Sequence, residues 1–220
     1  MNTPTATLRR STEERERDPE ATRANILQIA TEEFAEKGFS GARVDDIAAR
    51  TNTSKRMIYY YFGDKEGLFV AVIEQAYAGI RQIEANLSLD HLDPEQALRT
   101  LVGFTFDYQN ANEGFIRLVM VENIHRGEHL ARSATLQRLN WPVIESLRDI
   151  CERGREAGVF RAGIDPIDLH MSISALCFFN VANRATFSGI FKRDMASDTA
   201  LARRREIVVD TILAYVTRRG

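Results

Sequence analysis

The amino-acid sequence predicts an all-α protein of about nine helices. Its apolar residues recur every three or four positions through most of the chain, which is the spacing of one helix face. The pairs Asp18-Pro19, Asp93-Pro94 and Asp165-Pro166 each place a capping carboxylate before a proline that suits a first helical turn. Nowhere does an alternation of apolar and polar residues, bounded by turns, indicate a strand.

The first part of the chain divides into a polar arm and three helices. Residues 1–17 are polar and carry mixed charge, so we expect a flexible arm. A first helix is expected over 18–38, where it ends in a glycine able to adopt the left-handed conformation. Two short helices follow at 43–50 and 54–62, with a turn at 51–53 between them.

The rest of the chain is expected to be helical throughout. A long helix follows the break at Gly63-Asp64, and its apolar residues recur from Leu68 to Leu87. A break or kink is expected at Gly127 and at Trp141-Pro142. The same periodicity predicts later helices near 94–110, 113–125 and 133–157, one that starts at Asp165-Pro166, and a last one from about 198 to 217.

Composition narrows the class of protein. The 220 residues include 29 Lys and Arg against 31 Asp and Glu, a net charge of −2 that excludes a uniformly basic nucleic-acid coat. Cys151 and Cys177 have no paired spacing, so a disulfide scaffold and a cysteine-based zinc site are not expected. The N-terminus lacks the apolar segment of a signal peptide, and no apolar run reaches the length of a membrane helix. We therefore expect a cytoplasmic protein without a membrane segment.

The segment of about 43–62 has the organisation of a helix-turn-helix, in which the second helix enters the major groove of DNA. The second helix starts at Ser54, and Lys55 and Arg56 on its first turn can reach bases or phosphates. Successive residues on a helix are about 100° apart, so the three tyrosines 59–61 cannot all face inward. At least one of them is expected to be exposed, and at least one to pack in the core.

Positive charge is focused on this second helix. Residues 50–65 sum to a charge of +3, whereas residues 1–49 sum to −3. Because phosphate contacts supply much of the affinity for DNA, this distribution favours a small DNA-reading element on an otherwise acidic protein.

Between Ile26 and Phe69 the chain carries a run of markers: an aromatic residue after the glycine of the first helix, an apolar-x-x-Ile-Ala second helix, a Ser-Lys start, a Tyr-Tyr-x-Phe end and a Lys-Glu-x-Leu-Phe entry into the next helix. With these markers the stretch resembles the N-terminal domain of TetR-family transcriptional regulators. The resemblance implies a three-helix DNA-binding domain at 18–66 and a larger helical domain at 67–220 for ligand binding and dimerisation. By position, the implied DNA contacts are Arg43, Ser54, Lys55, Arg56, Tyr59, Tyr60 and Lys65.

The chain departs from the family's pattern at three positions. Asn52 stands where the turn commonly has glycine, and asparagine is the next-best left-handed residue. Arg43 stands where the second helix usually starts with Thr or Ser, so the usual cap is lost and a cation on phosphate could replace it. Tyr61 stands where histidine often precedes the final aromatic residue, which leaves open the contact made there.

The resemblance also implies a cavity for a small molecule, whose occupation shifts the fourth helix and with it the recognition helix. Glu122 shares an apolar arc with Phe115 and Leu118, so it needs a partner, either a protein cation or the ligand. Ordinary packing and interhelical hydrogen bonding remain open for every candidate. The candidate ligand-binding residues are Phe104, Thr105, Tyr108, Phe115, Glu122, His125, Asn180 and Arg184.

A single helix-turn-helix would bind DNA weakly, so a homodimer on a palindromic operator is expected. The apolar arcs of the last two long helices are wider than one covering layer demands, although core packing within the chain remains the alternative. The candidate interface residues are Phe178, Phe179, Ile207, Val208, Ile212 and Tyr215.

A second hypothesis comes from a different class of protein. His125-x-x-Glu128-His129 matches the H-x-x-E-H pattern of zinc peptidases, which needs both histidines on one face of a regular helix. Gly127 in the middle weakens such a helix. We therefore expect a ligand-responsive repressor that binds double-stranded operator DNA, has no catalytic activity, cofactor or metal, and is released by a small organic effector. The alternative is an all-α metal-dependent hydrolase.

Overall fold

The structure is a computed structural model that describes residues 19–217. The expected arm at 1–17 therefore lies outside the described residues. The described part is all-α, as predicted, with an isolated bridge between Phe160 and Thr217 as its sole β pairing. Its α-helices are α1 (Pro19–Gly41), α2 (Val44–Arg50), α3 (Lys55–Phe62), α4 (Lys65–Glu84), α5 (Pro94–Ala111), α6 (Glu113–Ile124), α7 (Ala134–Glu156), α8 (Pro166–Ala182), α9 (Arg184–Phe191) and α10 (Asp198–Val216).

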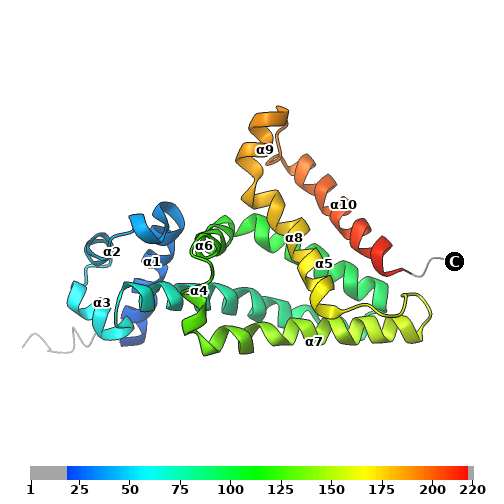
Figure 1. Ribbon diagram of the computed structural model, residues 1–220, viewed down its shortest axis with the longest axis horizontal. Helices are drawn as coiled ribbons and strands as arrows, with labels where there is room; N and C mark the ends of the chain where they lie inside the picture. Colours follow the sequence, from blue (N-terminus) through cyan, green and yellow to red (C-terminus); the bar gives the residue numbers. More distant parts are fainter. Residues whose placement is uncertain (1–18, 218–220) are drawn as a thin grey trace, which may run out of the picture.

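The molecule has a small head and a larger body, joined by α4 (Figure 1). Helices α1, α2 and α3 form the head, and the first half of α4 packs on them. Helices α5 to α10 form the body, in which α7 runs beside α4 while α8 and α10 pack on α5. Because α4 starts in the head and ends in the body, any change in its tilt is transmitted to both.

Each part has its own apolar core. The head core includes Ile26, Phe34, Ile47 and Ile58, and it is closed by Phe69 of α4. The body core is built from apolar faces of α5, α7, α8 and α10. Its buried members include Leu98, Leu101, Phe106, Leu147, Ile150, Phe160, Leu169, Ile173, Val208 and Ile212.

Helix ends follow the predicted signals at most positions. Gly38 has φ 70° and ψ 176°, so the regular path of α1 ends there before one further turn. Asp93 and Asp165 accept hydrogen bonds from backbone amides of the first turns of α5 and α8, as the Asp-Pro pairs predicted. The break at Gly127 is also observed, since this glycine has φ 76°.

Three expectations about the helices need correction. The fourth helix was expected to reach Leu87, but it ends at Glu84, and Ser88 beyond it is left-handed with φ 49°. The break expected at Pro142 is absent, because α7 continues through this residue. The separate helix α9 was not expected from the sequence.

Candidate DNA-binding surface and effector cavity

The turn between α2 and α3 has the backbone geometry that a helix-turn-helix needs. Asn52 is left-handed with φ 51°, so it takes the conformation for which glycine is usually chosen. Ser54 caps α3, and its Oγ accepts a hydrogen bond from the Met57 amide at 3.2 Å. The turn therefore sets α3 at a fixed angle to α2 without the glycine.

Helix α3 has one buried face and one exposed face. Ile58 is 0% exposed in the head core, whereas Tyr60 is 80% exposed. Tyr61 is half-buried against the same core, so one tyrosine packs and another projects, as expected. Lys55 and Arg56 are also exposed, and the Lys55 ammonium lies 3.2 Å from Asp45 of α2. This surface presents cations and a phenol on the outer side of α3.

Two of the predicted DNA contacts lie at the edges of this surface. Arg43 is exposed just before α2, with extended backbone (φ −120°). Lys65 starts α4, and its ammonium lies 4.9 Å from the ring centre of Phe39. Partial burial lowers the pKa of Lys65 from its ordinary value. The structure thus places five of the seven predicted DNA-binding residues on α3 or at its cap, and Arg43 and Lys65 at the starts of α2 and α4.

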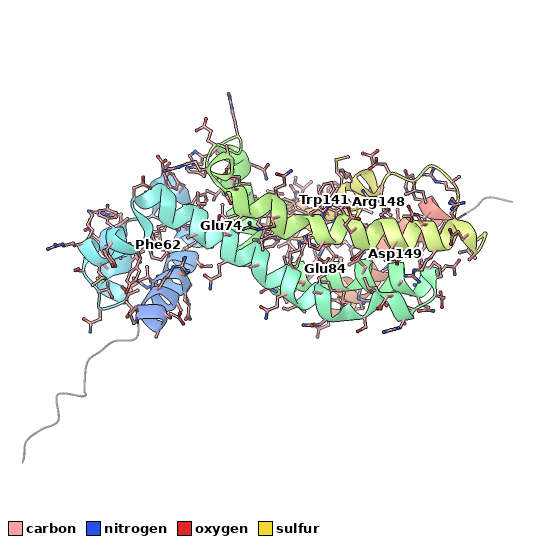
Figure 2. All side chains as sticks on the ribbon, turned by 90° about the horizontal axis from the view of Figure 1, so that it is seen from below. Phe62, Glu74, Glu84, Trp141, Arg148 and Asp149 are labelled. Atoms are coloured by element: carbon pink, nitrogen blue, oxygen red, sulfur yellow. The ribbon has the colours of Figure 1, made fainter. Side chains whose placement is uncertain are left out.

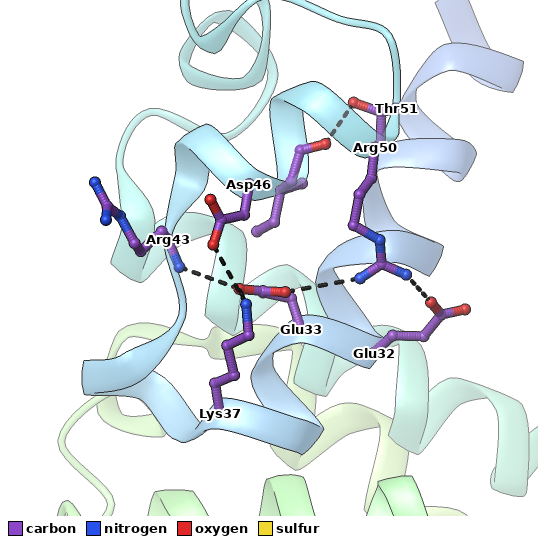
Figure 3. A network of polar contacts seen from close by, with 8 residues as sticks. Glu32, Glu33, Lys37, Arg43, Asp46, Arg50 and Thr51 are labelled. Atoms are coloured by element: carbon purple, nitrogen blue, oxygen red, sulfur yellow. Dashed lines mark hydrogen bonds and ion pairs between the residues drawn. The ribbon is translucent and has the colours of Figure 1, made fainter.

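The buried carboxylate of Glu33 organises the head, a role that sequence reasoning missed. Glu33 is 1% exposed on α1, and Lys37 binds it at 2.7 Å. Its Oε1 also accepts a hydrogen bond from the Arg43 amide at 3.4 Å, and Arg50 lies 3.7 Å from Oε2 (Figure 3). Hydrogen bonding to Glu33, and then to Asp46, raises the pKa of Lys37. Glu33 therefore anchors the residue that precedes α2, although no side chain caps the first turn of this helix.

A cavity of about 380 Å³ lies in the body, lined by α4, α5, α6, α7 and α8 and partly open to solvent. Trp141 on α7 and Glu84 on α4 come from the two long helices that run side by side (Figure 2). This size falls within the range of small-molecule sites, about 300–1,000 Å³. The remaining lining residues are Tyr77, Ile80, Arg81, Thr105, Gln109, Phe115, Val119, Gln137, Asn140, Ile144, His170, Ser174 and Phe178.

Three polar residues of the cavity lining pair with one another. Arg81 forms an ion pair with Glu84, and its Nε donates to Oδ1 of Asn140 at 3.1 Å. Burial raises the pKa of the Glu84 carboxyl, an effect that Arg81 opposes. Burial, and then the charge of Arg81, lowers the pKa of His170 to about 4, so its imidazole is uncharged at neutral pH.

The predicted ligand-binding residues separate into two groups. Thr105 and Phe115 line the cavity, and the Tyr108 ring packs on Phe115 with 6.3 Å between centroids. Phe104 stacks on Tyr108 but is not part of the lining. Sequence reasoning missed Tyr77 and Arg81, although their spacing of four residues on α4 places both on one helix face.

The other predicted ligand-binding residues lie away from this cavity and are held by neighbours in the chain. Glu122 pairs with His129, and His125 packs edge-on against Phe39. Asn180 and Arg184 both donate to Oδ1 of Asn110, at 2.8 Å and 2.7 Å. The partner that Glu122 required is thus a histidine of the protein.

The residues of the zinc-peptidase pattern do not lie on a helix. Helix α6 ends at Ile124, and the pattern falls in a turn where Arg126 (φ 59°) and Gly127 are both left-handed. Across residues 19–217, no group of three or more His, Cys, Asp or Glu side chains is placed to hold a metal ion. The hydrolase hypothesis fails on this backbone geometry.

The predicted interface residues also divide by location. Phe179, Ile207 and Tyr215 are exposed on α8 and α10, each close to half of its surface. By contrast, Val208 and Ile212 lie in the chain's own core and cannot reach a second copy. Phe178 faces the cavity. Core packing within the chain, the alternative left open, therefore accounts for part of the apolar arc.

The described helices were also compared with the requirements of a membrane span. None of those between residues 19 and 217 combines the length and the apolar character that a membrane span requires.

Comparison with known proteins gives matches over nearly the whole chain. Residues 26–72 match the family model described as bacterial regulatory proteins, tetR family, and residues 94–212 match the tetracyclin repressor-like C-terminal domain. The HTH-type transcriptional repressor NicS of Pseudomonas putida is 39% identical over 209 residues, which cover 95% of this chain and 99% of that protein. The HTH-type transcriptional repressor SCO4008 of Streptomyces coelicolor is 33% identical and covers 73% of this chain and 78% of its own length.

Solved structures agree with these matches. The crystal structure of SCO4942 from Streptomyces coelicolor superposes with a TM-score of 0.66 at 28% identity, covering 90% of this chain and 99% of that one. A tetR-family regulatory protein from Rhodococcus RHA1 has a TM-score of 0.70 at 21% identity, covering 90% and 98%, and so shares the fold. These matches agree with the head and body of the structure, and they show that the chain belongs to the TetR family of bacterial transcriptional regulators.

Proposed function

We propose that this regulator is a repressor that binds a palindromic operator as a homodimer and is released from DNA by a small organic effector. The observation that carries the DNA-binding part is the outer face of α3, where Tyr60 projects opposite the buried Ile58. Lys55 and Arg56 lie on the first turn of the same helix, as major-groove recognition requires. Occlusion of a promoter needs no catalytic step, and such a regulator works in the cytoplasm, beside the chromosome.

The homodimer is supported by the exposed apolar side chains of α8 and α10. Phe179, Ile207 and Tyr215 are large side chains left exposed to water on two helices that pack against each other. A second head doubles the number of phosphates and bases contacted, which a monomer with so few cations on α3 needs.

The effector part is supported by the course of α4. This helix starts at Lys65, just after the recognition helix, and its second half contributes Tyr77, Ile80, Arg81 and Glu84 to the cavity. A ligand that favours a different tilt of α4 also favours a different spacing of the two heads. Each tenfold loss of DNA affinity requires about 1.4 kcal/mol of differential ligand binding between the two states.

The test is a fluorescence-anisotropy titration of DNA from upstream of the regulator's own gene, at several salt concentrations. Lys55→Ala should weaken binding to every DNA sequence and lower the salt slope by about 1, because one phosphate contact is lost. Arg56→Ala and Tyr60→Ala should cost more on the operator than on random DNA. Arg155→Ala is the control, because it removes an exposed arginine at the far end of α7. It should change neither the DNA affinity nor the salt slope. Absence of binding by a folded dimer at low salt would refute the proposal.

A further inference from the structure

We propose that the cavity of the body selects an uncharged, flat aromatic molecule of about two rings that donates a hydrogen bond. This inference rests on the proposed function, in which the cavity is the effector site. It adds the chemical class of the effector, which the matches to the family do not supply.

The size of the cavity sets the size of the ligand. An engineered protein cavity of about 150 Å³ is known to hold benzene. At about 380 Å³, the cavity here has room for roughly twice that ligand, with space for a small polar group.

The walls of the cavity favour an aromatic ligand. Tyr77 of α4 and Phe115 of α6 meet edge to face, at 87° and 5.2 Å between centroids. Trp141 of α7 and Phe178 of α8 line the cavity as well. Rings that contact other rings in offset or edge-to-face geometry gain about 0.5–1.5 kcal/mol beyond burial of their area. A flat ring system can make such contacts with several walls at once.

The ionic groups of the cavity oppose a charged ligand. Among the described residues of the lining, Arg81 is the one arginine or lysine and Glu84 the one acid, and they form an ion pair. A carboxylate ligand would compete with Glu84 for the Arg81 guanidinium and would place a second anion beside this buried carboxylate. A cationic ligand would compete with Arg81 for the Glu84 carboxylate in the same way. His170 offers no compensating positive charge, since its imidazole is neutral.

The side chain of Gln109 favours a ligand with a hydrogen-bond donor. Its side chain is 5% exposed and lines the cavity, and within the described part of the chain its Oε1 has no hydrogen-bond partner. A buried acceptor left unpaired costs about 1–3 kcal/mol, so a ligand that supplies an N–H or O–H group recovers that cost. Thr105 cannot supply it, because its hydroxyl donates to the Leu101 carbonyl at 2.9 Å.

The experiment is isothermal titration calorimetry of the full chain with four probes of one shape. These are 2-naphthamide and 2-naphthol, which are neutral donors, 2-naphthoate, which is an anion, and naphthalene, which has no donor. We expect the two neutral donors to bind about tenfold more tightly than either of the others. Equal or tighter binding of 2-naphthoate would overturn the charge assignment, and equal binding of naphthalene would overturn the donor assignment.

Two variants test whether the probes bind in this cavity. Gln109→Met keeps the length of the side chain but removes the acceptor, so it should abolish the preference for 2-naphthol over naphthalene. Val119→Trp should fill the cavity and prevent binding of every probe. Each variant must first show the circular dichroism spectrum and the melting temperature of the unchanged protein, which shows that it is folded. Unchanged probe binding in Val119→Trp would place the ligand elsewhere and overturn the proposal.

Failure of this inference can be distinguished from failure of the proposed function. A protein that binds its operator but none of the four probes refutes the ligand class alone. A protein that binds the neutral donors but never an operator refutes the repressor function instead.

Discussion

His129 Nδ1 lies 2.8 Å from Oε2 of Glu122, and both side chains are buried where the body meets the head. The other oxygen of Glu122 accepts hydrogen bonds from the amides of His129 and Leu130, at 3.0 Å and 2.9 Å. The His129 ring also packs on Phe39 of α1, with 4.3 Å between centroids. This pair therefore fixes the α6–α7 turn against the DNA-binding head.

Replacing Glu122 with glutamine should destabilise the protein. The glutamine side chain retains the shape, but its NH2 group replaces one of the two oxygens of Glu122. This group then faces either the backbone amides of His129 and Leu130 or the His129 ring, and the charge of the carboxylate is lost. We expect the free energy of unfolding to fall by about 1–3 kcal/mol, measured by urea denaturation. Glu113→Gln, an exposed change on the same helix, is the control and should be neutral. A Glu122→Gln protein as stable as the unchanged one would contradict the importance of the pair.

The Glu33 carboxylate should matter for DNA binding although it lies behind the reading face. Glu33→Gln weakens the contacts of this side chain with the Arg43 amide, Lys37 and Arg50, so α2 and α3 should lose their fixed orientation. We expect faster hydrogen exchange of the α2 amides and weaker operator binding. Glu36→Gln, exposed on the same helix, should leave both measurements unchanged. Unaltered hydrogen exchange of the α2 amides in Glu33→Gln would argue against this role of Glu33.

Two glycines of the body should respond differently to alanine. A Cβ at Gly154 would collide with the ring of Phe160, which is buried, so Gly154→Ala should lower stability by about 1–3 kcal/mol. A Cβ at Gly103 would meet only the guanidinium end of Arg205, which can move toward solvent. Thermal melts should show a clear loss for Gly154→Ala and a smaller effect for Gly103→Ala. The reverse order would contradict the packing described.

The pH dependence of stability should carry a contribution from His170. Its pKa falls from an ordinary value of 6.5 to about 4 on folding, so between these pH values the unfolded chain binds a proton that the folded chain does not. Stability is complete above pH 6.5 and should fall by about 3 kcal/mol as the pH approaches 4. His170→Gln should remove this part of the pH profile in urea unfolding. Identical profiles for the two proteins would show that His170 protonates freely.

Neighbouring residues on α10 should separate dimerisation from folding. Ile207→Glu places a charge on the exposed apolar surface, so it should yield a folded monomer in analytical ultracentrifugation. Val208→Ala removes buried methyl groups and should lower stability by about 2 kcal/mol at equal dimer content. A dimeric Ile207→Glu protein would exclude this face as the interface.

Local sequence determined much of this protein. The Asp-Pro starts of α5 and α8, the Ser54 cap, the left-handed Asn52 and the 3.6-residue periodicity each act within a few positions. These signals are therefore readable without a fold, and they sufficed to predict an all-α chain with a helix-turn-helix.

Tertiary structure alone decided the partners of the buried polar groups and the lining of the cavity. Glu33 finds the Arg43 amide ten residues away, and Arg81 finds Asn140 across two helices. The way in which helices cross decides which part of an apolar arc faces a cavity, a core or a second copy. Phe178 lines the cavity, Val208 lies in the core and Ile207 is exposed. Helical periodicity marks the apolar side of each helix, but only packing fixes the neighbour that this side meets.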